Sequence, residues 1–151
     1  MRIQVKYVKA RLALLLLDTS AMVRMEFVRQ KQIYFVLAGA TGRAWALGPA
    51  HIVGTAAPGE IGNCVLSAHR DTYFSVLHDI DIGDEIVVEA QVSGVVRYRV
   101  RSIRVVKDTN TAIQQDFGDR RLTLITDYPF DQSGTLRYAV VATSPVQECG
   151  S

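Results

Sequence analysis

The chain contains little cysteine and no long hydrophobic run. Its two cysteines, Cys64 and Cys149, are too few for a disulfide framework, and no cluster of cysteine and histidine has zinc spacing. The compact apolar stretch at residues 12–17 is shorter than the roughly 20 apolar residues that cross a bilayer. The sequence therefore argues against a disulfide-stapled domain and a structural zinc site, and residues 12–17 do not by themselves make a membrane span.

The chain also lacks a strong excess of charge of one sign. Its formal net charge is +2 at pH 7, with 48% hydrophobic and 21% charged residues. This balance is ordinary for a globular protein and gives no general reason to expect a nucleic-acid partner. Arg97, Arg99, Arg101 and Arg104 mostly alternate with apolar residues, which predicts the solvent-facing side of a strand.

The length of 151 residues predicts one domain with a single core. We expect this domain to cover residues 22–144, followed by a flexible tail at residues 145–151. Residues 1–21 combine two arginines and two lysines with the apolar stretch, and predict a helical segment. Packing on the domain is the simplest interpretation of this segment; a basic interfacial helix and the remnant of a membrane anchor are alternatives.

From residue 22 onward, short segments of β-forming residues alternate with glycine, proline and aspartate, which is typical of an all-β domain. Seven or eight strands with one or two short helices predict a closed or nearly closed β-barrel. The expected strands cover residues 25–37 (one or two, broken near Gln30), 64–68, 85–90, 95–106, 121–127 and 136–142. A short helix is expected within residues 71–80, capped by Asp71, and loops at 39–48 and 107–119.

Three polar residues that are far apart in sequence follow or end apolar strands. They are His69 after residues 64–68, Asp127 after 121–126, and Arg137 at the start of the last strand. The ends of strands are places where a rigid scaffold can present a side chain to solvent with a fixed position. We therefore regard these three residues as candidates for one site.

The sequence around these residues resembles the sortase family. Four motifs carry the resemblance, over about residues 32–142: His-Arg-Asp-Thr at 69–72 followed by Phe and Leu, Ile-Gly-Asp at 82–84, Thr-Leu-Ile-Thr-x-Tyr-Pro-Phe at 123–130, and Leu-Arg-Tyr at 136–138. The segment LAGATGRAWALGPAHIVGTAAPGE at 37–60 is most similar to the Gram-negative class of this family.

The resemblance implies an eight-stranded sortase β-barrel and a cysteine transpeptidase. In this family a cysteine attacks the threonyl-glycine bond of an LPxTG-type C-terminal sorting signal, and an amine acceptor resolves the thioacyl enzyme. The implied partners are a surface protein that carries the signal and an amine acceptor of the cell envelope, with no cofactor and no nucleic acid. The implied location is the cell envelope, with a membrane anchor and the catalytic domain outside the cytoplasm.

By motif position, Asp127 occupies the place of the family's cysteine. A thiol reacts as the thiolate, and a nearby imidazolium and guanidinium lower its pKa. The resemblance assigns these groups to His69, which also protonates the leaving amine, and Arg137, which stabilises the oxyanion. A carboxylate is a much weaker nucleophile and would form an anhydride, so we expect this chain to be inactive or nearly so. Ion pairs of Asp127 with His69 and Arg137 should still hold the site together.

The sequence leaves four explanations open for Asp127. It is an engineered trap, a natural change in a dead homologue, a sequencing or gene-level change, or a one-letter stand-in for an oxidised cysteine, because a sulfinate resembles a carboxylate. Two other functions remain as alternatives. One is a non-catalytic pseudosortase that binds sorting-signal peptides or an envelope protein. The other is an aspartate-based hydrolase that uses Asp71 or Asp131 as its second carboxylate.

Four further residues are candidates for substrate binding because they adjoin the motifs: Ser67, Ala68, Thr126 and Tyr128. Thr126 is also explained simply as a β-forming residue. Alternation along the strand at 64–68 puts Cys64 on the face opposite Ser67 and His69. Cys64 is therefore expected to be a core residue and not the nucleophile.

Overall fold

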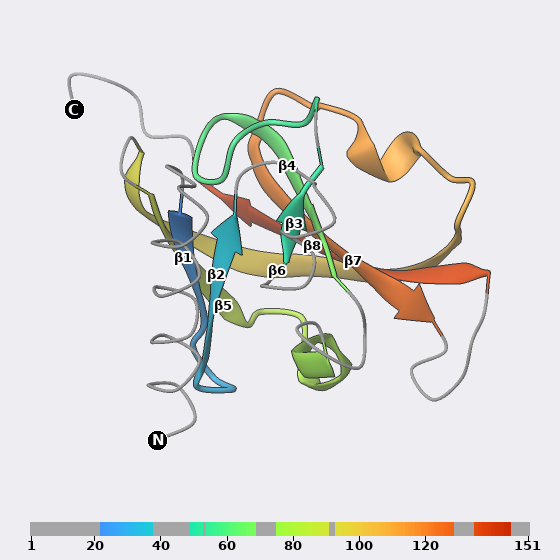
Figure 1. The fold of residues 1–151 in the computed structure, drawn as a ribbon, viewed down its shortest axis with the longest axis horizontal. Coiled ribbons are helices and arrows are strands. Elements are labelled where there is room, and N and C mark those ends of the chain that lie inside the picture. The colour runs from blue at the N-terminus through green and yellow to red at the C-terminus, as the bar shows by residue number, and fades with distance from the viewer. Residues whose placement is uncertain are drawn as a thin grey trace.

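Eight strands and two short 3-10 helices make up the described part of the chain (Figure 1). The computed structural model describes residues 22–37, 49–52, 54–68, 75–90, 93–128 and 135–145. In chain order the elements are β1 (Met22–Phe27), β2 (Gln32–Leu37), β3 (Ala50–His51), β4 (Gly62–Ser67), η1 (Ser75–Asp79), β5 (Glu85–Ala90), β6 (Gly94–Lys107), η2 (Ala112–Gln114), β7 (Arg120–Tyr128) and β8 (Leu136–Ser144).

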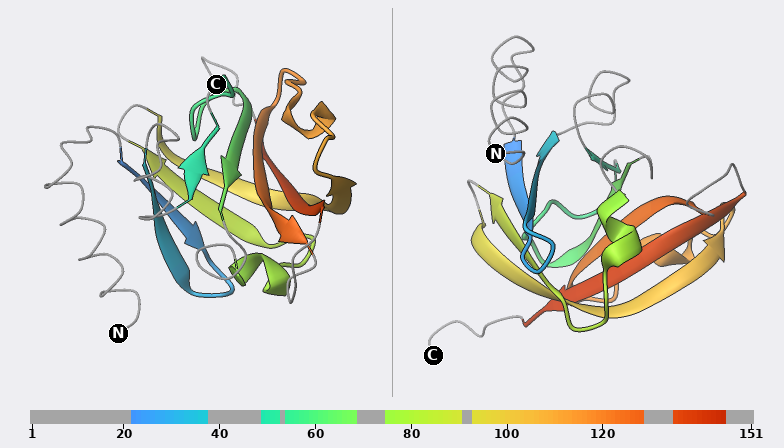
Figure 2. Two further views of the ribbon diagram at one scale, coloured as in Figure 1. Left: turned by 45° about the vertical axis from the view of Figure 1, so that its right-hand side comes forward. Right: turned by 90° about the horizontal axis from the view of Figure 1, so that it is seen from below.

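The strands form a closed barrel in the order β1-β2-β3-β4-β7-β8-β6-β5. The pairs β2–β3 and β4–β7 are parallel, and the other neighbours are antiparallel. Figure 2 shows β1 and β2 on the side of the barrel away from β7 and β8. The prediction of an all-β barrel of about eight strands is confirmed.

Alternation along the strands decides which side chains fill the barrel. In β6, Val96, Tyr98 and Val100 are buried, whereas the arginines between them are exposed. In β4, the core contains Cys64 together with Leu66. The expected solvent-facing side of β6 and the expected inward orientation of Cys64 are therefore both confirmed.

Three differences from the expected elements have physical reasons. The two-residue strand β3 was not expected, because so short a segment carries no alternation to recognise. The loop expected at 107–119 contains η2, a single turn closed by the bond from Gln115 N to Ala112 O. The predicted short helix is present as the 3-10 helix η1. Ile80, the residue after it, donates its backbone N–H to Leu77 O, which is the i to i+3 bond of a 3-10 helix. Residues 71–74 of that prediction, including Asp71, lie outside the described residues.

A buried amide fixes the connection between β6 and β7 to the barrel wall. Asn63 is 2% exposed, and its Nδ2 donates to Ile113 O at 2.8 Å and to Gln115 O at 3.0 Å. Its Oδ1 accepts a hydrogen bond from Thr123 Oγ1 at 2.7 Å. Since the Thr123 side chain is fully buried, this network satisfies polar groups that water does not reach.

Some predictions lie outside the described residues. The helical segment at 1–21, His69, Asp131 and most of the tail at 145–151 belong to this group. Within the described segments, none of the helices has the length and apolar character needed to cross a membrane.

Candidate active site

Asp127, near the end of β7, lies opposite Arg137, near the start of β8. They are direct partners in the antiparallel register of the two strands. Arg137 Nη1 donates a hydrogen bond to Asp127 Oδ1, and the two residues form an ion pair. Their side chains are 26% and 38% exposed, respectively, so the pair is open to solvent on one side. The expected ion pair between these two residues is confirmed.

Strand alternation places this pair on the outer face of the barrel wall. Inward-facing neighbours of Asp127 on β7, including Leu122 and Leu124, belong to the core, as do Val140 and Ala142 of β8. Asp127 and Arg137 occupy the other set of positions in their strands. A substrate would therefore approach the pair from outside the barrel.

The candidate substrate-binding residues divide between the two faces. Ser67 pairs with Ile125 in the parallel register of β4 and β7 and is half-buried on the same face as Asp127. Ala68 belongs to the core and is 4% exposed. By alternation, Thr126 lies on the inward face as well, and it is 1% exposed. Of these residues, Ser67 shares the face of the ion pair.

Thr126 and its neighbours form the inner side of the same strand end. Thr126 Oγ1 is buried and has no hydrogen-bond partner among the described residues. Its cross-strand partner Tyr138 stacks on Tyr128, with ring centroids 5.9 Å apart and an interplanar angle of 16°. Burial raises the pKa of Tyr138. This aromatic pair lies directly behind the outward ion pair and gives that strand end a packed support.

Tyr138 was not among the sequence candidates for the site. Its position directly after Arg137 in the Leu-Arg-Tyr motif was the available signal, but alternation alone assigns it to the opposite face. The stack with Tyr128 depends on the β7–β8 register, which the sequence does not specify.

Cys64, the cysteine within the described residues, is unsuited to be a nucleophile. Cys64 is fully buried in the core. Burial raises the pKa of its thiol to about 12, with a further rise from the charge of Glu60. Since the thiolate is the reactive form, Cys64 is inert at neutral pH. The prediction that Cys64 is a structural residue is confirmed.

The acidic residues after η1 are held by a side chain of the β1–β2 turn. Arg29 donates to both carboxylate oxygens of Asp84, at 2.9 Å from Nε to Oδ1 and 2.9 Å from Nη2 to Oδ2. It also pairs with Asp81 at 3.5 Å. In the described part of the chain, no group of three or more histidine, cysteine, aspartate or glutamate side chains could hold a metal ion.

The fold and the sequence were compared with known proteins. The chain covers 69% of Streptococcus agalactiae sortase C1 in its complex with MTSET, with 85% of its own residues aligned, 24% identity and a TM-score of 0.75. Sortase A from Corynebacterium diphtheriae gives 21% identity and a TM-score of 0.74 over 88% of this chain and 64% of that one. A sortase D5 transpeptidase from Clostridium perfringens gives 22% identity and a TM-score of 0.73 over 84% of this chain and 80% of that one. At these identities the likeness establishes the fold.

Among curated protein sequences, no significant match was found. The family model described as "Sortase domain" matches residues 28–145, which include all the described strands except β1. A match over this length decides membership where structural likeness alone does not. The chain belongs to the sortase family.

Proposed function

We propose that this protein derives from a cysteine transpeptidase of the sortase type and that Asp127 stands where the nucleophilic cysteine belongs. The substrate of that activity is an LPxTG-type C-terminal sorting signal on a surface protein, and the acceptor is an amine of the cell envelope. The observation that carries the proposal is the outward pair of Asp127 and Arg137 at the end of β7. It puts a partly exposed carboxylate and a guanidinium at one site on a scaffold of this family.

The chemistry of the thiol form follows from these positions. A thiolate at position 127 would attack the threonyl carbonyl carbon, and the C–N bond to glycine would break as the leaving amine takes a proton. The acceptor amine would then attack the thioester, release the thiolate and lose its proton. Arg137, already directed at position 127, is placed to donate to the oxyanion that develops in each step.

The same geometry explains why the aspartate form should fail. The Asp127 carboxylate accepts a hydrogen bond from Arg137, which lowers its already weak nucleophilicity. Attack on an amide would produce an anhydride, a product much less stable than a thioester. We therefore expect turnover of the present chain to be absent or close to background.

The proton donor of the proposed reaction is His69. The parallel register of β4 and β7 joins Ser67 to Ile125, and Ala68 N donates to Ile125 O at 3.2 Å. His69 follows the end of this described segment in sequence and lies outside the described residues, so its role in the proposal rests on its place in the motif at 69–72.

Two finer assignments also belong to the proposal. The resemblance of residues 37–60 favours the Gram-negative class of sortases. The location proposed is the cell envelope, with the barrel outside the cytoplasm and residues 1–21 as part of an anchoring segment.

A binding function is the second candidate, because the site keeps its charges without a thiol. The ion pair of Asp127 and Arg137 preserves an ordered polar surface where a sorting signal would lie. A pseudosortase would use that surface to hold the peptide, or another envelope protein, without cutting it.

The test has two steps. Intact mass and peptide mapping across residues 121–137 first establish whether residue 127 is an aspartate or an oxidised cysteine. Cleavage of an LPxTG-type peptide is then measured for the protein and for Asp127→Cys. We expect an aspartate mass, no cleavage by the protein and cleavage with amine transfer by Asp127→Cys.

Matched variants separate the nucleophile from its surroundings. Asp127→Ser gives a side chain close in size to that of cysteine but without a thiol, and this variant should remain inactive. Arg137→Gln in the Asp127→Cys background should lower kcat by about 10²–10³-fold, as expected for the loss of one oxyanion donor. If Asp127→Cys binds sorting-signal peptides and cuts none of them, the pseudosortase is the correct function. A sulfinate mass would identify an oxidised enzyme.

A further inference from the structure

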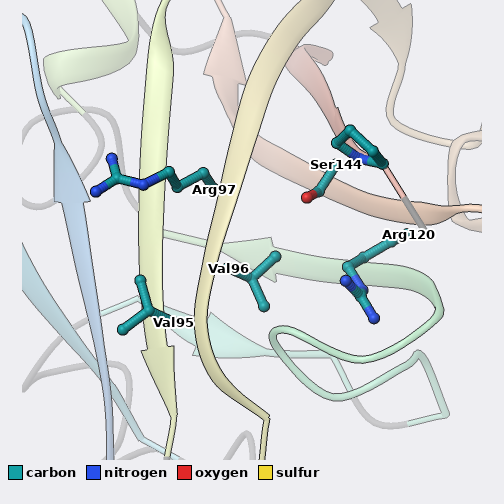
Figure 3. Close-up of a pocket in the computed structure, with 6 residues that line it drawn as sticks. Val95, Val96, Arg97, Arg120 and Ser144 are labelled. Carbon is teal, nitrogen blue, oxygen red and sulfur yellow. The ribbon is translucent and has the colours of Figure 1, made fainter. Parts of the chain in front are cut away.

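A small pocket lies at the end of β7 and β8 opposite to the candidate active site. Arg120 begins β7 and is the register partner of Ser144, which ends β8. The pocket has a volume of about 270 Å³ and is shown in Figure 3. It is lined by Val95, Val96, Arg97, Arg120, Ser144 and Pro145.

Arg120 is the unusual residue of this pocket. Its side chain is half-buried, and its Nε is buried without a hydrogen-bond partner in the described part of the chain. Its neighbour Arg121, in contrast, donates to both oxygens of Asp119, at 3.2 Å from Nε and 2.9 Å from Nη2. A charged donor that is removed from water without an acceptor costs free energy, so this position favours a ligand that supplies the acceptor.

The other arginine of the pocket has a partner. Arg97 forms an ion pair with Glu85 on the outer face of the barrel. In Figure 3 the Arg97 guanidinium points away from Arg120. Arg120 is therefore the cation available to a ligand at this position.

The positive charge of Arg120 also affects a buried side chain at this end of the barrel. Tyr98 is fully buried, and its hydroxyl accepts a hydrogen bond from Gly59 N at 3.1 Å. Burial raises the pKa of Tyr98 to about 12, and the positive charge of Arg120 opposes this rise. The charge of Arg120 therefore lies close enough to Tyr98 to stabilise the ionised form of that side chain.

The remaining lining groups limit the ligand. Ser144 offers a hydroxyl, whereas Val96 and Pro145 offer apolar surface. A guanidinium fork matches the oxygens of a carboxylate or phosphate better than any other common group. The pocket volume lies just below the range for drug-sized ligands, which favours a small group.

We propose that this pocket binds an oxyanion, a carboxylate or a phosphate, carried by a small organic group, with Arg120 as the charged donor and Ser144 as the second polar contact. The site is separate from the proposed transpeptidase site and does not depend on the residue at position 127. The apolar wall would hold the carbon atoms next to the anionic group.

The proposal is tested by titrating the ¹⁵N-labelled protein with acetate and, separately, with inorganic phosphate, at constant ionic strength maintained with chloride. We expect saturable shifts of the Arg120 Nε–H resonance and of the backbone amides of Val96 and Ser144 with at least one of the two anions. Saturable shifts with acetate alone would identify a carboxylate ligand, and saturable shifts with phosphate alone would identify a phosphate ligand. Shifts that do not saturate with either anion, or that spread over the whole surface, would overturn the proposal.

Matched variants assign the effect to the pocket. Arg120→Gln should weaken binding about tenfold or more, because a charge-assisted bond is lost. Arg104→Gln removes the same charge from an exposed position of β6 and should leave binding unchanged. Ser144→Ala keeps Arg120 and should weaken binding by a smaller factor, so that the site remains testable if Arg120→Gln does not fold. Equal effects of the Arg120 and Arg104 variants would refute a specific site.

Discussion

Replacement of Asn63 by alanine should destabilise the protein more than any exposed polar substitution in the same region. Asn63 makes three side-chain hydrogen bonds, two to carbonyl groups of the β6–β7 connection and one from Thr123. At about 1 kcal/mol for each bond, the upper estimate of the loss is about 3 kcal/mol. The two carbonyls can regain water when the connection loosens, but the fully buried Thr123 hydroxyl cannot.

We therefore expect Asn63→Ala to lower the free energy of unfolding by about 2–3 kcal/mol. For a domain of this size the corresponding fall in Tm is roughly 5–10 °C. Urea denaturation followed by circular dichroism gives the first quantity, and a thermal scan gives the second. Asn110→Ala is the matched control, because Asn110 makes an exposed local bond to Ala112 N and its loss should cost less than about 1 kcal/mol.

A double-mutant cycle isolates the buried part of this network. Thr123→Val removes the hydroxyl while keeping a similar shape, and we expect a loss of about 1 kcal/mol. In combination with Asn63→Ala the losses should be less than additive by about 1 kcal/mol, since both variants remove the same bond. The reasoning is refuted by additive effects, or by an Asn63→Ala loss below about 0.5 kcal/mol.

Two further predictions concern backbone conformation and pH. A Cβ at Gly62, where φ is +116°, would lie 2.8 Å from the Cβ of Ala56. At Gly83, where φ is +95°, no atom of the described residues outside its chain neighbours would lie within 4 Å of a Cβ. Urea denaturation should therefore show that Gly62→Ala costs about 1–3 kcal/mol more than Gly83→Ala. Burial raises the pKa of both Cys64 and Tyr98 to about 12, so the unfolded chain releases these protons first and the free energy of unfolding should fall as pH rises from about 9 to about 12. Urea midpoints at constant ionic strength measure that slope, and a rise in stability over this range would contradict it.

The sequence was sufficient to predict the fold class because the long strands carry a strong periodic pattern. From Val96 to Arg101 in β6, arginine alternates with apolar residues, and the exposed and buried side chains match that alternation. Beyond the register shift between Val100 and Ser102 the match is lost. Alternation along β4 likewise predicts that Cys64 faces the core, where Cys64 and Leu66 both lie. The ion pair of Asp127 with Arg137 was predicted from motif positions and is present in the register.

Features that depend on pairing between distant segments were not predictable. Alternation says which residues share a face, but it does not say which strand lies next to which. Consequently the stack of Tyr128 on Tyr138 and the tie between Asn63 and η2 had no signal in the sequence. Adjacent Arg120 and Arg121 look equivalent in sequence, yet within the described segments a carboxylate pairs with Arg121 and none pairs with Arg120.

The two proposed sites use opposite ends of one antiparallel ladder. Asp127 pairs with Arg137 at one end, and Arg120 pairs with Ser144 at the other, seven residue steps away along β7. At about 3.3 Å per residue the two pairs are about 23 Å apart, a separation at which substitutions usually act independently. Under the proposed function, an aspartate in place of the nucleophilic cysteine ends transpeptidation without removing any contact of the pocket. We therefore expect binding at the other end of the same two strands to be the same in the protein and in Asp127→Cys, because the backbone hydrogen bonds between β7 and β8 do not depend on the side chain at position 127.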